Sequence, residues 1–195
     1  MQSPRVLGRS GLMRCCRLLH CLLVLMLPAS VVRADEPPSL EYQVKAAFVI
    51  KFGSFVEWPS ERHASREPFV IGILGKDPFG KAFDEAVKLE RINGRPISVK
   101  RSDEAKDLLG CQIVFIHSDE SGRVGSQMQS LSASGILTIG ESPDFARHLG
   151  VVGFIKEKGK VRFEINTALA ERSGLKISSK LLQVGKIVSD GDQKG

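Results

Sequence analysis

One segment of the chain has the residue types and spacing of a phosphate-binding loop: Gly75-Lys76-Asp77-Pro78-Phe79-Gly80-Lys81-Ala82. Such a loop directs backbone N–H groups at phosphates, and a final Ser or Thr hydroxyl holds magnesium. Here Ala82 has no hydroxyl, Pro78 lacks an N–H group and Asp77 adds a negative charge. We therefore expect no nucleotide hydrolysis. Two interpretations remain open, a capped helix start and an anion site at that helix start. The candidate anion-binding residues are Gly75, Asp77, Gly80 and Lys81.

Other residue types that could support catalysis lack the spacing it requires. The histidines after residue 34 are far apart and form no zinc-binding pair; they are His63, His117 and His148. Ser178-Ser179-Lys180 lacks the spacing of Ser-Lys acyl enzymes. Several carboxylates could be paired by the fold, but no spacing selects a pair; they are Asp77, Asp84, Glu85 and Glu164. The sequence therefore predicts a non-enzymatic protein with no catalytic residue, no metal and no cofactor.

Two features are candidates for recognition of a partner. In the extended segment 162–166, alternation places Arg162, Glu164 and Asn166 on one face, which is either solvated surface or a recognition surface. Trp58, the only tryptophan, ends an apolar segment, and it is either a core residue or an exposed binding residue. The candidate partner-binding residues are Trp58, Arg162, Glu164 and Asn166.

These residues must be positioned by helices and strands that the apolar spacing predicts. Apolar residues three and four apart predict a helix over 40–57. Asp77 and Pro78 are typical of the first residues of a helix, here running to about 89. Further helices are expected over 102–109, 121–131, 143–149 and 178–188. Strands are expected over 69–74, 96–101, 111–117 and 136–139, and a hairpin over 151–156 and 160–165. The strand over 96–101 follows the Asn93-Gly94 turn and is expected at an edge of the sheet.

Short apolar strands that alternate with helices indicate an α/β fold. We expect a single domain with a mainly parallel, mixed sheet, flanked by helices on both faces, to which the late hairpin adds antiparallel strands. The expected divisions are a signal peptide over 1–34, a leader over 35–39, the domain over 40–188 and a loose tail over 189–195.

The first 34 residues are typical of a secretory signal. Arginines precede the apolar run Leu18–Leu27, Pro28 ends it, and Ala34 offers a cleavage position. This segment holds five of the 28 Lys and Arg, which leaves 23 against 22 Asp and Glu, a net charge of +1. The basic balance of the whole chain is therefore no argument for nucleic-acid binding.

Cleavage would also remove three of the four cysteines. Cys111 is the one that remains, so no internal disulfide can form in the mature chain. Because Cys111 begins an apolar segment, we expect a small buried side chain, with an intermolecular or redox-active thiol as the alternative.

Six segments in order resemble the exported YfiR-like regulators: KAAFVIKFGSFVEWP at 45–59, IGILGKDPFG at 71–80, CQIVFI at 111–116, GILTIGES at 135–142, VRFEIN at 161–166 and GLKISSKLLQVGKIV at 174–188. The resemblance implies a periplasmic repressor that binds the sensor domain of an inner-membrane diguanylate cyclase and lowers cyclic-di-GMP signalling and biofilm formation. It also implies a homodimer and an outer-membrane lipoprotein that can sequester the repressor. The disulfides of the best-known member do not carry over, because Cys111 is the only cysteine after residue 34. A periplasmic module that binds a small anion is the alternative.

Overall fold

The computed structural model describes residues 38–59 and 67–191. The predicted signal peptide, with its cleavage position, and residues 192–195 of the predicted tail lie outside these residues. The strands are β1 Val56–Glu57, β2 Phe69–Leu74, β3 Arg91–Ile92, β4 Arg95–Ser102, β5 Ile113–Ile116, β6 Leu137–Gly140, β7 Val152–Glu157, β8 Lys160–Asn166, β9 Lys176–Ile177 and β10 Lys186–Val188. The helices are α2 Leu40–Phe52, α4 Lys81–Lys88, η2 Ala105–Leu108, η3 Ser118–Glu120, α5 Ser121–Ala133, α6 Phe145–His148, α7 Thr167–Arg172 and α8 Ser179–Leu182.

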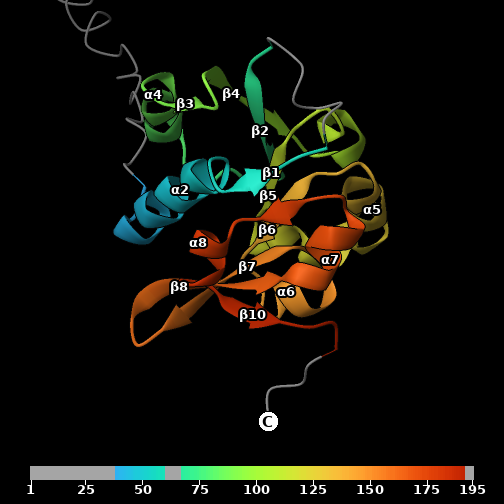
Figure 1. Ribbon diagram of the computed structural model, residues 1–195. Coiled ribbons are helices and arrows are strands. Elements are labelled where there is room, and N and C mark those ends of the chain that lie inside the picture. The colour runs from blue at the N-terminus through green and yellow to red at the C-terminus, as the bar shows by residue number, and fades with distance from the viewer. Residues whose placement is uncertain (1–37, 60–66, 192–195) are drawn as a thin grey trace, which may run out of the picture. The chain divides into compact units, whose positions relative to one another are not determined.

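The centre of the domain is an eight-stranded sheet with strand order β10-β8-β7-β6-β5-β2-β4-β3 (Figure 1). Strands β4, β2, β5, β6 and β7 are parallel neighbours. β7 and β8 form an antiparallel hairpin in which Phe154 is opposite Phe163, and β10 pairs with β8 in parallel. A separate two-stranded sheet pairs β1 with β9. The predicted α/β class, the mainly parallel sheet and the late hairpin are confirmed.

Helices cover both faces of the large sheet (Figure 1). The chain moves from β2 to β4 in one direction along the sheet and from β5 to β6 in the other. Because such crossovers are right-handed, the intervening helices lie on opposite faces. One hydrophobic cluster joins residues of α2 and α4 to the sheet, and a second joins residues of η2, α5 and α6 to it.

The apolar strands supply the centre of both clusters. Ile71 and Ile113 are fully buried on the α2 side, and Val114 is fully buried on the α5 side. Cys111 is 1% exposed, as predicted for a small core residue. A strand that is buried on both faces has an almost continuous apolar sequence, and β5 is such a strand.

The first two predicted helices begin or end elsewhere. α2 ends at Phe52, because Gly53 caps it and the chain turns to pair Val56 with Ile177 of β9. α4 begins at Lys81 and not at Asp77, because the Asp77 side chain accepts hydrogen bonds from the N–H groups of Phe79 and Gly80 and stabilises a turn before the helix.

The C-terminal part differs most from the prediction. The segment predicted as one helix over 178–188 divides into α8 and the edge strand β10, because backbone pairing with β8 competes with the helical spacing. α7 and β9 were not predicted. The tail was predicted to be loose from residue 189, but Asp190 accepts hydrogen bonds from Asn166 and Arg172 at 2.6 Å each.

Candidate functional site

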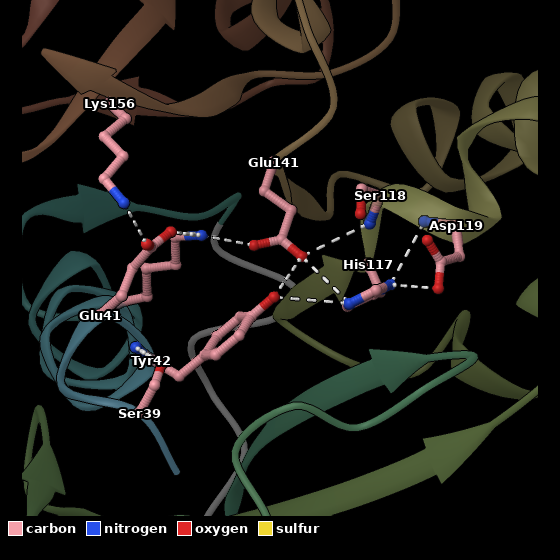
Figure 2. Close-up of polar contacts among 9 residues, drawn as sticks. Ser39, Glu41, Tyr42, His117, Ser118, Asp119, Glu141 and Lys156 are labelled. Carbon is pink, nitrogen blue, oxygen red and sulfur yellow. Dashed lines mark hydrogen bonds and ion pairs between the residues drawn. The ribbon is translucent and has the colours of Figure 1, made fainter.

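Polar side chains gather where two neighbouring parallel strands end (Figure 2). His117 directly follows β5, and Glu141 directly follows β6. Helix α2 lies against this edge and contributes Tyr42 and Lys45. The carboxyl ends of parallel strands are where α/β proteins place ligands and reacting groups. We call the group formed by Glu41, Tyr42, Lys45, His117, Asp119, Glu141 and Lys156 the polar cluster.

Its centre is a buried ion pair. The Lys45 Nζ atom lies 2.6 Å from Oε2 of Glu141, and the two side chains are 8% and 5% exposed. The Lys45 Nζ atom also lies 2.8 Å from Oε1 of Glu41, whose Oε2 is 3.0 Å from Nζ of Lys156 at the surface. Since an uncompensated charge in the interior is costly, loss of one member of this chain of alternating charges would destabilise the packing of α2 against the sheet.

The second carboxylate oxygen of Glu141 is the acceptor for Tyr42. The Tyr42 hydroxyl donates to Oε1 of Glu141 over 3.1 Å, and Nε2 of His117 lies 3.4 Å from that oxygen. The backbone N–H of Asp119 donates to Nδ1 of His117 over 3.2 Å. Nδ1 is thus an acceptor, which places the proton of a neutral His117 ring on Nε2, facing Glu141 and Tyr42.

Two groups of the polar cluster titrate away from their ordinary ranges. Burial, followed by the charge of Glu141 and the hydrogen bond to it, raises the pKa of Tyr42 to about 12. Hydrogen bonds from Lys45 and then Lys156 hold the pKa of Glu41 below its ordinary value. The polar groups of the cluster are one another's partners. Among residues 38–59 and 67–191, no three His, Cys, Asp or Glu side chains are grouped so as to hold a metal ion.

The alkaline titration of Tyr42 reports on the cluster directly, because Tyr42 is the only tyrosine in the chain. Absorbance at 295 nm is expected to show a midpoint near pH 12, because burial and the charge of Glu141 raise the pKa of Tyr42, and Glu141→Gln is expected to lower that midpoint. The folded state holds this proton more tightly than the unfolded chain, so stability should fall as the pH rises from about 10. A midpoint near pH 10 in the folded protein would mean that Tyr42 does not contact Glu141.

The candidate anion site is engaged within its own loop. The Asp77 carboxylate accepts from the N–H groups of Phe79 and Gly80 at 2.7 and 3.2 Å, and Nε of Arg101 donates to it over 2.7 Å. Gly75 has a positive φ of 75°, and a Cβ there would lie 2.3 Å from Cγ of Glu120. Lys81 is the exposed first residue of α4. Asp77 thus accepts the hydrogen bonds that an external anion would need.

Three of the four candidate partner-binding residues are buried. Trp58 is 5% exposed, donates its indole N–H to the Gln112 carbonyl over 3.1 Å and packs edge-on against Phe69. Glu164 and Asn166 are each 1% exposed, because α6 covers their face of β8. For Trp58 the structure supports the alternative of a core residue. For Glu164 and Asn166 the expectation of an exposed face, whether solvated or used for recognition, is wrong. Arg162 is exposed.

Glu164 and Asn166 belong to a second buried polar group beside α6. Nη2 of Arg147 donates to Oε1 of Glu164 over 3.1 Å, and Lys186 of β10 lies 3.5 Å from the same oxygen. Asn166 donates to the Ala146 carbonyl over 2.8 Å, and its Oδ1 accepts from the N–H of Leu169 at the start of α7. Asn166 and then Arg172 lower the pKa of Asp190. These contacts hold strand β10 and helix α7 to the sheet.

Sequence reasoning treated His117 only as a possible metal ligand and did not identify Glu141, Tyr42 or Lys45. Both His117 and Glu141 are the first polar residues after apolar strand segments. In a parallel sheet this position brings residues from distant segments together at one edge, so the signal was present. The contribution of α2 could not be found in this way, because its place over the sheet depends on tertiary packing.

The fold and site define a class of protein: a doubly wound α/β domain whose polar residues at the strand ends are paired with one another. The chain belongs to the YfiR/HmsC-like family (DUF4154), whose profile matches residues 42–186. Membership identifies it with a family of periplasmic regulators. No helix in the part of the chain that the structure describes is long and apolar enough to cross a bilayer.

Among solved structures, the domain is similar to a conserved domain protein from Vibrio cholerae O1 biovar eltor str. N16961, with 10% sequence identity and a TM-score of 0.46. The match covers 78% of this chain and 60% of the other, so the chain spans less than two thirds of that protein's length. Comparison with curated proteins gives no significant match.

Proposed function

We propose that this chain acts in the periplasm by binding the sensor domain of an inner-membrane diguanylate cyclase and holding the enzyme inactive. The result is less cyclic-di-GMP and less biofilm formation. The observation that supports this proposal most is the family match over residues 42–186. An outer-membrane lipoprotein that sequesters the chain would release the cyclase.

Binding alone can repress an enzyme in this way. A regulator shifts its partner only by the difference in its affinity for the active and inactive conformations. To move the cyclase from 99:1 active to 99:1 inactive, that difference must be about 10⁴-fold. No catalytic group is required of the chain, which is consistent with polar residues that satisfy one another.

Deletion and complementation test the site of action. Deleting the gene is expected to raise cyclic-di-GMP, and the chain carrying residues 1–34 is expected to restore the original level. The matched control is the same chain without residues 1–34, which remains in the cytoplasm and should fail to restore it. Rescue by the control, or no change on deletion, would contradict periplasmic repression of a cyclase.

Cross-linking tests the partner. Tagged chain is exported and cross-linked, and the envelope fraction is then purified on the tag. We expect recovery of an inner-membrane protein with a diguanylate cyclase domain. Recovery of the tagged chain without a cyclase, under conditions in which the deletion strain is complemented, would mean that the chain acts on another target.

A further inference from the structure

The hairpin of β7 and β8 extends beyond the rest of the large sheet as a two-stranded arm (Figure 1). Its strands pair with each other as far as Glu157 and Lys160. β6 pairs with β7 no further than Gly153, and β10 pairs with β8 no earlier than Glu164. Within the described residues, 154–163 thus have no strand neighbour outside the hairpin, and we call them the arm.

The arm concentrates the positive charge of the chain. Its exposed cations are Lys156, Lys158, Lys160 and Arg162, and its only carboxylate is Glu157. Four cations against one carboxylate give the arm a net charge of +3, whereas the whole chain after residue 34 has a net charge of +1. The rest of that chain therefore has a net charge of 1 − 3 = −2. The arm is a local basic surface on a domain that is otherwise slightly acidic.

Three of these cations have no acidic partner in the described part of the chain. Lys156 is the exception, because its Nζ atom lies 3.0 Å from Oε2 of Glu41. Among residues 38–59 and 67–191, no carboxylate lies within ion-pair distance of Lys158, Lys160 or Arg162. These three charges are exposed and are available to an anion outside the domain.

Strand register aligns the cations along one face of the sheet. Lys160 and Arg162 are two residues apart on β8 and share a face. Lys186 of β10 is paired with Glu164, the next position on that face, and its side chain is 58% exposed. Successive positions are about 7 Å apart along the strand. Lys158 extends the series to the turn, and we call Lys158, Lys160, Arg162 and Lys186 the basic row.

Aliphatic side chains are exposed next to the basic row. Ile187 follows Lys186 in β10 and is 54% exposed. Val184, two residues before that strand begins, is 65% exposed. Because β10 is the last strand of the sheet, Ile187 lies at the sheet edge. Basic side chains beside exposed aliphatic ones are typical of surfaces that bind at the interface of a bilayer.

We infer that the arm and β10 form a surface that binds the anionic phospholipids of a bilayer. The basic row binds the lipid phosphates, and Ile187 enters the boundary between headgroups and acyl chains. The arm extends beyond the sheet, so a flat surface can reach its cations. Each Lys or Arg close to an anionic bilayer strengthens binding about fivefold. The four cations of the basic row together favour an anionic over a neutral bilayer on the order of 500-fold.

Two other roles for these cations are less consistent with the structure. Lysines at an unpaired strand edge prevent sheets from associating edge to edge, but that role gives no reason for exposed aliphatic side chains at the same edge. A soluble polyanion or an acidic protein surface would bind the basic row and leave Ile187 uncovered. A bilayer binds the charges and covers the aliphatic side chain together.

Sedimentation with lipid vesicles tests this surface in the exported chain, purified from the periplasm. Wild type is expected to bind vesicles of phosphatidylethanolamine and phosphatidylglycerol, and not vesicles of phosphatidylcholine. Raising the salt concentration from about 0.1 M to about 1 M shortens the screening length from about 10 Å to about 3 Å and should release the chain. No binding to the anionic vesicles, or equal binding to both kinds, would overturn the inference.

Charge substitutions locate the surface. The triple variant Lys158→Gln, Lys160→Gln and Arg162→Gln is expected to weaken binding to the anionic vesicles about 100-fold. These side chains are exposed and without acidic partners, so thermal unfolding should be unchanged. The matched control removes the same charge at exposed positions outside the arm, by changing Lys76, Lys88 and Lys106 to Gln, and should bind as wild type does. Equal losses in the two triple variants would mean that net charge, and not the arm, decides binding.

Ile187→Thr separates a bilayer from a soluble polyanion. Threonine keeps the β-branched shape that suits an edge strand but reduces the apolar surface. The variant is expected to weaken binding to the anionic vesicles severalfold and to leave binding to heparin, a soluble polyanion, unchanged. Unchanged binding of the variant to the vesicles would overturn the entry of Ile187 into the bilayer.

This inference stands apart from the proposed function. Vesicle binding requires no cyclase, and the deletion phenotype requires no contact with lipid. If a protein partner, and not a bilayer, binds the basic row, the wild-type chain will not bind vesicles. The arm variant will then fail to restore cyclic-di-GMP in the deletion strain, while its matched control restores it. That outcome overturns the membrane surface and leaves the proposed function standing.

Discussion

Glu141→Gln is expected to lower the free energy of unfolding by about 3 kcal/mol. The substitution keeps the shape of the side chain but leaves the buried Lys45 ammonium, 8% exposed, with the half-exposed Glu41 as its remaining carboxylate partner. The Tyr42 hydroxyl and His117 also lose the charge at their acceptor. Urea unfolding followed by the fluorescence of Trp58, the only tryptophan, measures the loss.

A surface ion pair of the same length provides the control. Nζ of Lys88 lies 2.6 Å from Oε1 of Glu85, but the side chains are 64% and 70% exposed. Glu85→Gln should therefore change stability by less than about 0.5 kcal/mol. Adding Lys45→Met to Glu141→Gln removes the buried charge and should recover part of the loss. Equal effects of the two glutamine substitutions would show that water screens the polar cluster.

Gly140→Ala is expected to destabilise the domain by about 3 kcal/mol, because it overfills a closed part of the core. A Cβ at Gly140 would lie 2.3 Å from Cδ2 of Phe145, and one at Gly150 would lie 2.1 Å from Cε1 of the same ring. Phe145 is 2% exposed, so its ring is enclosed by the core. Thermal unfolding followed by circular dichroism measures the effect.

The cause can be separated from any intrinsic effect of alanine. Adding Phe145→Leu removes the colliding ring atoms, so the double mutant should be more stable than Gly140→Ala alone. Gly110→Ala is the matched control, since a Cβ at Gly110 meets no atom within 4 Å. If the double mutant is less stable than either single mutant, the two residues do not collide.

Most of the central sheet could be predicted from the sequence. β2 and β5 are short apolar runs between turn residues, and such runs have few alternatives to a buried strand. The hairpin was equally clear, because Glu157-Lys158-Gly159 separates two strand-like segments. In the structure Lys158 and Gly159 take the positive φ values of a tight turn. For these elements the local sequence pattern is sufficient, and contacts with distant segments are consistent with it.

The remaining elements depend on partners far along the chain. β1 consists of two residues that become a strand because β9 lies beside them, more than a hundred positions later. β10 has helical spacing but pairs with the free edge of β8. Glu164 alternates with apolar neighbours as a surface residue would, yet Arg147 and α6 bury it. No local pattern contains this information.

Pairing of β1 with β9 joins the beginning of the domain to its end. α2 likewise depends on β8 for its packing. The rings of Phe48 and Phe52 pack edge-on against Phe163, with ring centroids 5.3 and 5.0 Å apart. Contacts between such distant segments form slowly and only after the late segments exist. A ribosome must therefore release nearly the whole chain before the domain can close.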